Sequence, residues 1–261
     1  MEKISIIRMN DTGAGIGKIK GKVVFVPKTM PGDVVTIDNI KKYKNHDEAE
    51  LISVIEASEN RVKPLCPFFE QCGGCDIMEM NYESQLKYKA KKVKGLLRKY
   101  ANLNIYPTIV GGSQFHYRNK IILHVKEGKL GLYANNTNDL VPIDKCFLVS
   151  ENVNKIINRI QEKVNLNTVE RVLIRENSNK ILVAFYGAID EEATILALKD
   201  SVSSLYLNDK HLCNEKYLLE TLGDCKFKIS KDSFFQINKE QTLNIYNKVK
   251  EYSKDSQRIM D

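Results

Sequence analysis

The chain has 261 residues, of which 43% are hydrophobic and 28% are charged, and its formal net charge is +7. This balance is typical of a soluble globular protein. No stretch reaches the roughly 18 consecutive apolar residues of a transmembrane helix, and the N-terminus lacks the apolar core of a signal peptide. We therefore expect a cytoplasmic protein, without a membrane partner, whose six cysteines stay reduced. The basic excess fits a polyanionic partner, and it fits a lysine-rich enzyme equally well.

The pattern of residues 1–57 predicts a small β-barrel. β-branched runs of near-alternating polarity indicate about five short strands, and strands so short must close into a barrel to avoid exposed edges. The strands are expected in "KISIIRM", "KVVFVP", "DVVTIDNI" and "AELISVIEA", with turns at "DTGAGIGKIKG" and "MPGD".

The glycines at 13, 15 and 17 could suggest a phosphate-binding loop, but such a loop needs a helix after it, and here a strand is expected. A hairpin turn is the preferred interpretation. Lysines decorate the barrel, with Lys18 as a candidate contact. Barrels of the oligonucleotide-binding type present such a face to nucleic acid. A solvated lysine-rich surface is the alternative.

Three cysteines, Cys66, Cys72 and Cys75, have the spacing C-x5-C-x2-C, and Cys146 is a candidate fourth ligand. Iron–sulfur clusters are commonly held by three closely spaced cysteines and a distant fourth. The Gly-Gly pair at 73–74 would let backbone N–H groups point at cluster sulfides. Zinc on four thiolates and reduced thiols without a metal stay open as alternatives.

Residues 81–100 predict an amphipathic helix capped by Asn81 or Ser84. Its expected buried positions are Leu86, Ala90, Val93, Leu97 and Tyr100. The other face carries cations and no expected acid: Lys87, Lys89, Lys91, Lys92, Lys94, Arg98 and Lys99. Like charges on one helix repel each other, and phosphate binding would relieve that repulsion. A face simply left basic is the alternative.

The rest of the chain alternates strands and helices, which suggests a compact α+β domain. Helices are expected near 150–164 and 191–204, with strands at "RVLIRE", "KILVAFY", "SLYLN", "YLLETL" and "KFKIS". Cys213 and Cys225 lack the flanking motif of a nucleophile, so both are expected to be small buried hydrophobes.

A final helix is expected after "SFFQIN", with Asn238 as its cap and Gln241 completing a capping box. An aromatic beside an amide suits an unstacked base, which needs stacking and hydrogen bonds to its edge. Core packing of both Phe residues in "FFQIN" is the alternative.

Taken together, the cysteine segment "CPFFEQCGGCDIMEMNYESQLKYK", the barrel motifs "GIGK", "VVFVP" and "MPGD", "YRNK" and "FFQIN" resemble the RNA uracil-5-methyltransferases over the whole chain. The resemblance is stronger to the ribosomal-RNA branch, which has a TRAM barrel and a 4Fe-4S cluster. It implies an α+β protein with three parts. These are an OB-like TRAM barrel at 1–57, an iron–sulfur domain at 58–82 and 115–230, and elements of a Rossmann-like methyltransferase domain at 83–114 and 231–261.

The resemblance implies methylation of C5 of a uridine by S-adenosylmethionine, with 23S rRNA as the expected substrate and tRNA as a second candidate. It makes Cys66, Cys72, Cys75 and Cys146 cluster ligands, and it places Gln236 at the methyl donor. The implied RNA contacts are Lys18, Lys87, Lys91, Arg118, Lys120 and Phe234.

In such enzymes a thiolate adds to C6 of uracil, C5 takes the methyl group, and a base removes the C5 proton. The resemblance puts the nucleophile and base beyond Asp261, so no catalytic residue is assigned. The chain is expected to be a monomer and to be inactive alone. The alternative function is a non-catalytic RNA-binding module that holds an iron–sulfur cluster or zinc.

Overall fold

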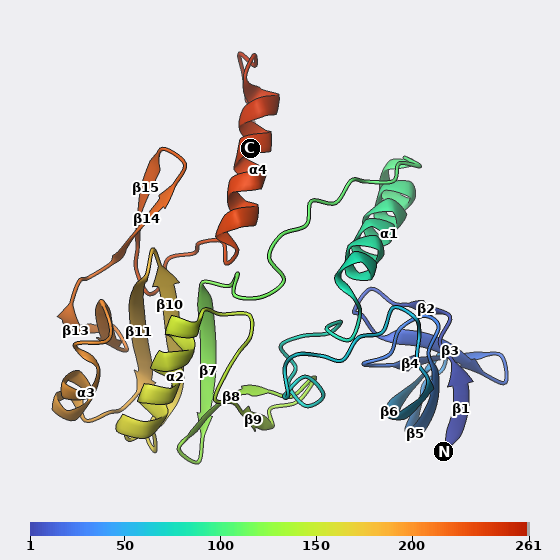
Figure 1. Cartoon of the computed structure of the whole chain (residues 1–261), viewed down its shortest axis with the longest axis horizontal. Helices are drawn as coiled ribbons and strands as arrows, with labels where there is room; N and C mark the ends of the chain where they lie inside the picture. The colour runs from blue at the N-terminus through green and yellow to red at the C-terminus, as the bar shows by residue number, and fades with distance from the viewer. Residues whose placement is uncertain (260–261) are drawn as a thin grey trace. The chain divides into compact units, whose positions relative to one another are not determined.

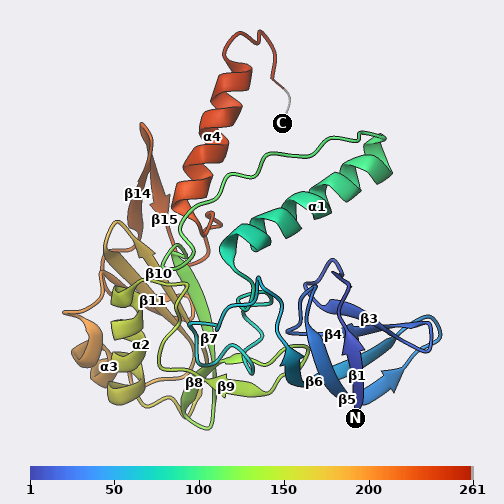
Figure 2. The ribbon, with the colours of Figure 1, turned by 45° about the vertical axis from the view of Figure 1, so that its right-hand side comes forward.

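Residues 1–259 are described by a computed structural model, in which the chain divides into two units, Met1–Gly111 and Gly112–Asp261. Figures 1 and 2 show the elements of each unit. None of the helices in the described part of the chain has the length and apolarity needed to span a bilayer. Met260 and Asp261, the last residues of the methyltransferase elements expected at 231–261, lie outside the described residues.

The N-terminal unit begins with a six-stranded sheet in the order β1-β5-β6-β4-β3-β2. All neighbours are antiparallel except β4 and β6, which are parallel. The strands are β1 (Glu2–Ser5), β2 (Arg8–Met9), β3 (Gly15–Ile19), β4 (Lys22–Val26), β5 (Val34–Lys42) and β6 (Asp47–Glu56).

One N-terminal stretch closes this sheet into a barrel. The first and last strands of the order, β1 and β2, follow each other directly in the chain. Between them, Ile6 N donates to Asp33 O at 2.8 Å on one side, and Ile7 N donates to Ile16 O at 2.9 Å on the other. The closure removes both open edges, which is the physical reason for expecting a barrel.

Alternation along the strands fills the barrel interior. Its core is the apolar set Ile4, Ile6, Val24, Val26, Val35, Ile37 and Ala49. Mostly β-branched, these side chains suit the pleated surface of strands.

The glycine-rich segment corrects one prediction. Residues 11–21 were expected to form a hairpin turn, but Gly15 and Gly17 lie within β3. A Cβ on Gly15 would overlap the hydroxyl of Thr29, and one on Gly17 would lie 2.8 Å from Cδ1 of Ile4. The glycines therefore permit close approach of neighbouring backbone, a demand that the sequence pattern does not distinguish from a turn.

A segment with neither helix nor regular strand, from residue 57 to residue 81, leads to α1 (Tyr82–Ala101). Asn81 caps this helix by accepting a hydrogen bond from Ser84 N at 2.9 Å. The expected apolar stripe is largely wrong. Only Ala90 is buried, while Val93 and Tyr100 are 39% and 73% exposed. The helix lies over one end of the barrel (Figure 2) and covers little of it.

The C-terminal unit contains a seven-stranded sheet in the order β13-β12-β11-β10-β7-β8-β9, in which only β11 and β12 are parallel. Its strands are β7 (Lys120–Lys126), β8 (Lys129–Tyr133), β9 (Leu140–Pro142), β10 (Val169–Asn177), β11 (Lys180–Gly187), β12 (Ser204–Leu207) and β13 (Lys210–Asn214). A hairpin, β14 (Leu218–Leu222) with β15 (Cys225–Ile229), follows.

Three helices complete this unit: α2 (Glu151–Lys163), α3 (Glu191–Leu198) and α4 (Lys239–Ser253). α2 and α3 contact each other and pack on the sheet (Figure 1). A second cluster joins Leu173 of β10 and Leu182 of β11 to Leu218 and Ile229 of the hairpin. Successive strand residues point to opposite faces, so Arg175 points to the same side of β10 as Leu173.

Most predicted elements of this unit are present, with two corrections. The helix expected over 191–204 ends at Leu198, because Ser204–Leu207 pairs in parallel with β11. The short polar strand β13 was not predicted. Asn238 caps α4 as expected, accepting from Gln241 N at 3.0 Å.

Candidate functional site

The cysteine segment forms a series of tight turns. Cys72 N donates to Phe68 O at 2.7 Å, and Gly74 N donates to the Cys72 sulfur at 3.3 Å. Cys72 is buried, while Cys66 and Cys75 are half-buried. The N–H donor aimed at sulfur is the contact that a thiolate favours, and glycine at 74 provides it without a side chain in the way.

The barrel holds this segment through Lys28 and Gly13. Lys28 Nζ donates to Cys75 O at 2.8 Å and lies 3.9 Å from the ring centre of Phe69. A Cβ on Gly13 would lie 3.1 Å from Ile77 Cγ2, so the turn there leaves little room for a side chain. The cysteine segment is therefore packed against the barrel.

Arg61 and Asp33 anchor the chain where it leaves the barrel. The carboxylate of Asp33 has no solvent exposure and accepts two hydrogen bonds from Arg61, at 2.6 and 3.0 Å. It also accepts from the backbone N–H groups of Met30 and Ser58. Burial alone would raise the pKa of Asp33, but these hydrogen bonds and the Arg61 charge hold it below its ordinary value.

Glu79, near the cysteine segment, is also a buried carboxyl, but unlike Asp33 it lacks hydrogen-bond partners among the described residues. It is 1% exposed. Burial raises its pKa, and the charges of Arg61 and Lys28 offset only part of that rise. Sequence inspection missed it, because an acid in a loop is ordinarily solvated.

The structure does not assemble the predicted metal ligands. No group of three or more His, Cys, Asp or Glu side chains in the described part of the chain is placed to hold a metal. Cys66, Cys72 and Cys75 lie in the N-terminal unit and Cys146 in the C-terminal unit. Cys146 N donates to Asn154 Oδ1 at 2.9 Å, and Asn154 Nδ2 donates back to Cys146 O at 3.2 Å. The thiol set suits a metal chemically, but the expected assembly of four stays a prediction.

In the C-terminal unit, "YRNK" and "FFQIN" lie side by side. Asn119 N donates to Ile237 O at 2.9 Å, and Asn119 Nδ2 donates to Gln236 O at 3.0 Å. The two Phe residues have different environments. Phe234 is 84% exposed, whereas Phe235 packs in the core beside Phe227, with ring centres 5.6 Å apart. Core packing therefore holds for Phe235 and is wrong for Phe234.

A buried arginine fixes the loop that presents Phe234. Arg175 is 1% exposed, and its guanidinium donates to Ser230 O at 3.2 Å and Ser233 O at 2.8 Å. Lys231, also buried, donates to Asp209 and Asp232 at 2.8 and 2.7 Å. Burial would lower the pKa of Lys231, but both carboxylates hold it far above its usual range. Neither residue was predicted; a cation next to "SFFQIN" was the only available signal.

Three cations gather beside this loop. Lys120 pairs with Arg175 across β7 and β10, and Arg118 is two residues before Lys120. Burial is the main cause that lowers the pKa of Lys120. The charge of Arg175 lowers this pKa further, and the charge of Asp232 partly offsets the decrease. The Nε atom of Arg118 is buried without a hydrogen-bond partner among the described residues. An anion would relieve the mutual repulsion of these groups.

The remaining candidate contacts, Lys18, Lys87 and Lys91, are exposed in the N-terminal unit. The expectation of a helix face without acids is wrong at Lys87, whose Nζ lies 2.6 Å from Oε1 of Glu83. An exposed pair of this kind contributes little to stability.

Comparison with known proteins assigns the barrel. Residues 2–59 match the family model described as "tRNA (uracil(54)-C(5))-methyltransferase, TRAM domain". The N-terminal barrel is a TRAM domain. The domain ends just before Asn60 and Arg61, which lead into the cysteine segment.

The whole chain is similar to RNA methyltransferases. It is 28% identical to an uncharacterized RNA methyltransferase of Halalkalibacterium halodurans, with 96% of this chain and 64% of the relative covered. It is 30% identical to one of Bacillus cereus, with 95% and 63% covered. The chain thus spans just under two thirds of the length of these curated relatives.

A solved structure shares the fold. The crystal structure of Pyrococcus abyssi tRNA (uracil-54, C5)-methyltransferase in complex with S-adenosyl-L-homocysteine matches with a TM-score of 0.75 at 23% identity. The match covers 95% of this chain and 64% of that structure. The TRAM domain and the mixed α+β fold are therefore confirmed.

The two cysteines outside the predicted ligand set also depart from expectation. Cys213 is half-buried on β13, and burial raises the pKa of its thiol. Cys225 is exposed at the start of β15, so the prediction of a buried hydrophobe is wrong there. Its position follows from the short turn that joins β14 to β15, which the sequence pattern placed only approximately.

Proposed function

We propose that this chain takes part in methylation of C5 of a uridine in RNA by S-adenosylmethionine. The TRAM domain and the similarity to RNA methyltransferases support RNA as the substrate. The fold neighbour, whose title names a uracil C5-methyltransferase with S-adenosyl-L-homocysteine, supports the reaction and the donor. The observation that carries the proposal is Phe234, a strongly exposed aromatic on a loop that buried Arg175 holds in place.

Each residue of this loop has a role in the proposal. Phe234 stacks on the target uracil once that base has left its helix, since a base in a stack cannot be reached. Arg118 and Lys120 neutralise an adjacent phosphate. Asn119 fixes the main chain of Gln236, whose exposed amide contacts the methyl donor. S-adenosylmethionine, when bound, supplies the electrophilic methyl group.

We assign no nucleophile to Cys213 or Cys225. A thiolate nucleophile needs a lowered pKa, whereas the pKa of Cys213 is raised by burial. Cys225 is exposed at the start of β15, where its thiol is open to water. Substituting either residue should leave methylation unchanged.

The four remaining cysteines are proposed to hold a 4Fe-4S cluster. Three thiols in one turn-rich segment, an N–H aimed at Cys72 and a distant fourth Cys are the supporting features. The ligands would be Cys66, Cys72, Cys75 and Cys146. The cluster would stabilise the segment after the TRAM domain, because ligand binding is coupled to folding.

Ribosomal RNA is the proposed substrate, with the tRNA alternative kept in the test. The combination of a barrel with a predicted cluster favours the ribosomal branch. The matched TRAM model and the fold neighbour both carry tRNA in their descriptions, so the barrel alone does not separate the two. The predicted monomer does not depend on this choice.

The test uses the 261-residue chain and, in parallel, a longer protein that contains it, with labelled S-adenosylmethionine and either ribosomal RNA or tRNA lacking the modification. 5-Methyluridine in digested RNA is the expected product. Phe234→Ala should lower the rate by roughly tenfold or more, in line with the stacking energy of one base, without lowering stability. RNA binding with no methyl transfer to either RNA would favour a non-catalytic module. An unchanged rate for Phe234→Ala would remove the assigned role of the loop.

A further inference from the structure

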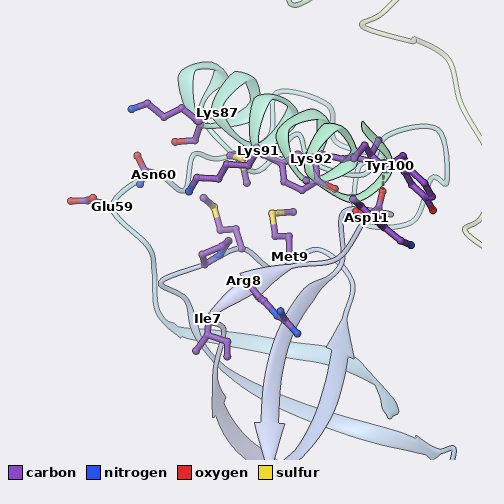
Figure 3. A pocket seen from close by; sticks show the side chains of 18 residues that line it. Ile7, Arg8, Met9, Asp11, Glu59, Asn60, Lys87, Lys91, Lys92 and Tyr100 are labelled. Atoms are coloured by element: carbon purple, nitrogen blue, oxygen red, sulfur yellow. Dashed lines mark hydrogen bonds between the residues drawn. The ribbon is translucent and has the colours of Figure 1, made fainter. Parts of the chain in front are cut away.

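A groove of about 710 Å³ lies within the N-terminal unit, between the N-terminal stretch of the TRAM domain and α1. Residues 7–11 form one wall, and the α1 side chains between 84 and 100 form the other (Figure 3). Two hydrogen bonds connect the walls. Tyr88 Oη donates to Asn10 O, and Lys92 Nζ donates to Asp11 O, both at 2.7 Å. The groove is thus a built feature rather than a gap between loosely placed elements.

Positive charge dominates the lining. Five cations line the groove against two carboxylates, those of Asp11 and Glu59. The cations are Arg8, Lys87, Lys91, Lys92 and Lys99. Figure 3 shows Lys91 reaching from α1 into the groove, with Met9 on the barrel side. Lys87 is paired with Glu83, but Lys91, Lys92 and Lys99 on the same helix wall repel each other, so a row of anions is the complementary occupant.

The groove also exposes flat and polarisable apolar surface. Met9, Tyr88 and Tyr100 line it with half-buried or exposed side chains, whereas the lining thioethers of Met30 and Met80 are buried. Tyr100 is 73% exposed and Leu96 is 45% exposed, so both leave apolar surface of α1 open to solvent. Aromatic rings and thioethers beside cations are the surface on which unpaired bases stack while the phosphates meet lysines.

We propose that this groove binds a single-stranded segment of RNA. The phosphates follow the lysines of α1, and the bases contact Tyr88, Tyr100 and Met9. The inference rests on the proposed function for the choice of RNA as partner, and it adds a binding site away from the Phe234 loop. A duplex would leave the apolar lining unused, because its bases are already stacked and its grooves are read by shape.

Gly95 provides the sharpest probe of the groove. It lines the groove, and a Cβ built on it meets nothing within 4 Å. A side chain at this position therefore enters open space without disturbing packing. Gly95→Glu places a carboxylate among the lysines, and Gly95→Gln is the matched neutral control of equal size.

The experiment measures binding of labelled oligouridine of about ten nucleotides, a length within the range of such sites, to the full 261-residue chain without methyl donor. Gly95→Glu should weaken binding by roughly tenfold or more relative to Gly95→Gln. Lys91→Ala should lower the slope of log affinity against log salt by about one. Lys89→Ala, on the same helix but outside the groove, should leave that slope unchanged. Thermal unfolding confirms that each variant is folded.

The inference would be overturned by equal effects of Lys89→Ala and Lys91→Ala, by equal affinity for a duplex of the same length, or by binding of an acidic peptide in preference to RNA. The proposed function is judged separately. If the wild-type protein binds RNA in the groove but transfers no methyl group, the methylation proposal alone would be removed. Methylation with unchanged RNA affinity in Gly95→Glu would remove the groove alone.

Discussion

Arg61 holds the fully buried carboxylate of Asp33 with two nitrogens, at 2.6 and 3.0 Å, and its Nη2 also donates to Lys28 O at 3.0 Å. Asp33 belongs to the "MPGD" turn of the TRAM domain, and Arg61 is the second residue beyond the domain. This pair connects the turn, the last strand and the cysteine segment. A single ion pair therefore fixes how the cysteine segment leaves the barrel.

Removal of this pair should be costly. Arg61→Ala leaves the Asp33 carboxylate buried without its cation, which should lower the free energy of unfolding by about 3 kcal/mol. Lys3→Ala, which breaks the exposed pair with Glu56, is the control and should change little. Urea unfolding followed by circular dichroism measures both. Equal small effects would mean that solvent reaches Asp33.

The same pair predicts a pH dependence. The pKa of Asp33 is lower when folded than its ordinary value of 3.8. A depressed pKa contributes stability that is present above 3.8 and is lost as the pH falls through the folded-state pKa. The stability difference between wild type and Asp33→Asn should therefore shrink on acidification below pH about 4. A difference that stays constant between neutral and strongly acidic pH would contradict this.

Glu79 should show the opposite sign. Its pKa is raised by burial, so the folded protein favours the protonated form, and ionisation costs stability as the pH rises above the ordinary value of 4.5. Glu79→Met, of similar size and without an unsatisfied carboxyl, should raise the free energy of unfolding at neutral pH by about 1 kcal/mol. Lower stability of this variant would indicate that Glu79 has a partner that compensates its burial.

Arg175 is predicted to act through the loop it holds. Arg175→Met removes the donor to Ser233 O and one of two donors to Ser230 O, the other being Ser233 N, at a cost of about 2 kcal/mol. Arg175→Lys retains the charge but lacks the forked donor geometry, so methylation should fall in both variants. If Arg175 positions the loop, each variant should show a lower rate of methylation together with faster proteolytic cleavage of residues 230–236. Slower methylation with unchanged proteolysis would argue for direct contact with RNA instead.

The proposed cluster has a direct test. Anaerobically purified protein should be brown and contain iron and acid-labile sulfide, about four of each per chain. Ser in place of Cys66, Cys72, Cys75 or Cys146 should remove both, whereas Cys213→Ser and Cys225→Ser should retain them. Colourless protein with about one zinc per chain would support a zinc site instead.

Local patterns in the sequence were sufficient for much of the fold. Alternating β-branched residues placed most strands, and the side chains of Asn81 and Asn238 marked the starts of α1 and α4. Both are short-range effects, since a strand pattern and a helix cap depend on residues a few positions apart. The motifs that gave the resemblance to RNA uracil-5-methyltransferases are equally local.

The tertiary structure decided what depends on residues far apart in the chain. Gly15 lies in a strand because it pairs with Met9 and Val26, and α3 ends early because Ser204–Leu207 pairs with β11. Phe234 and Phe235 are neighbours of one type, yet Phe235 enters the core while Arg175, 59 positions before Phe234, holds the loop that leaves Phe234 in solvent. Burial and pKa depend on which distant groups surround a side chain. For that reason Asp33, Glu79 and Arg175 acquired their roles only in the folded protein.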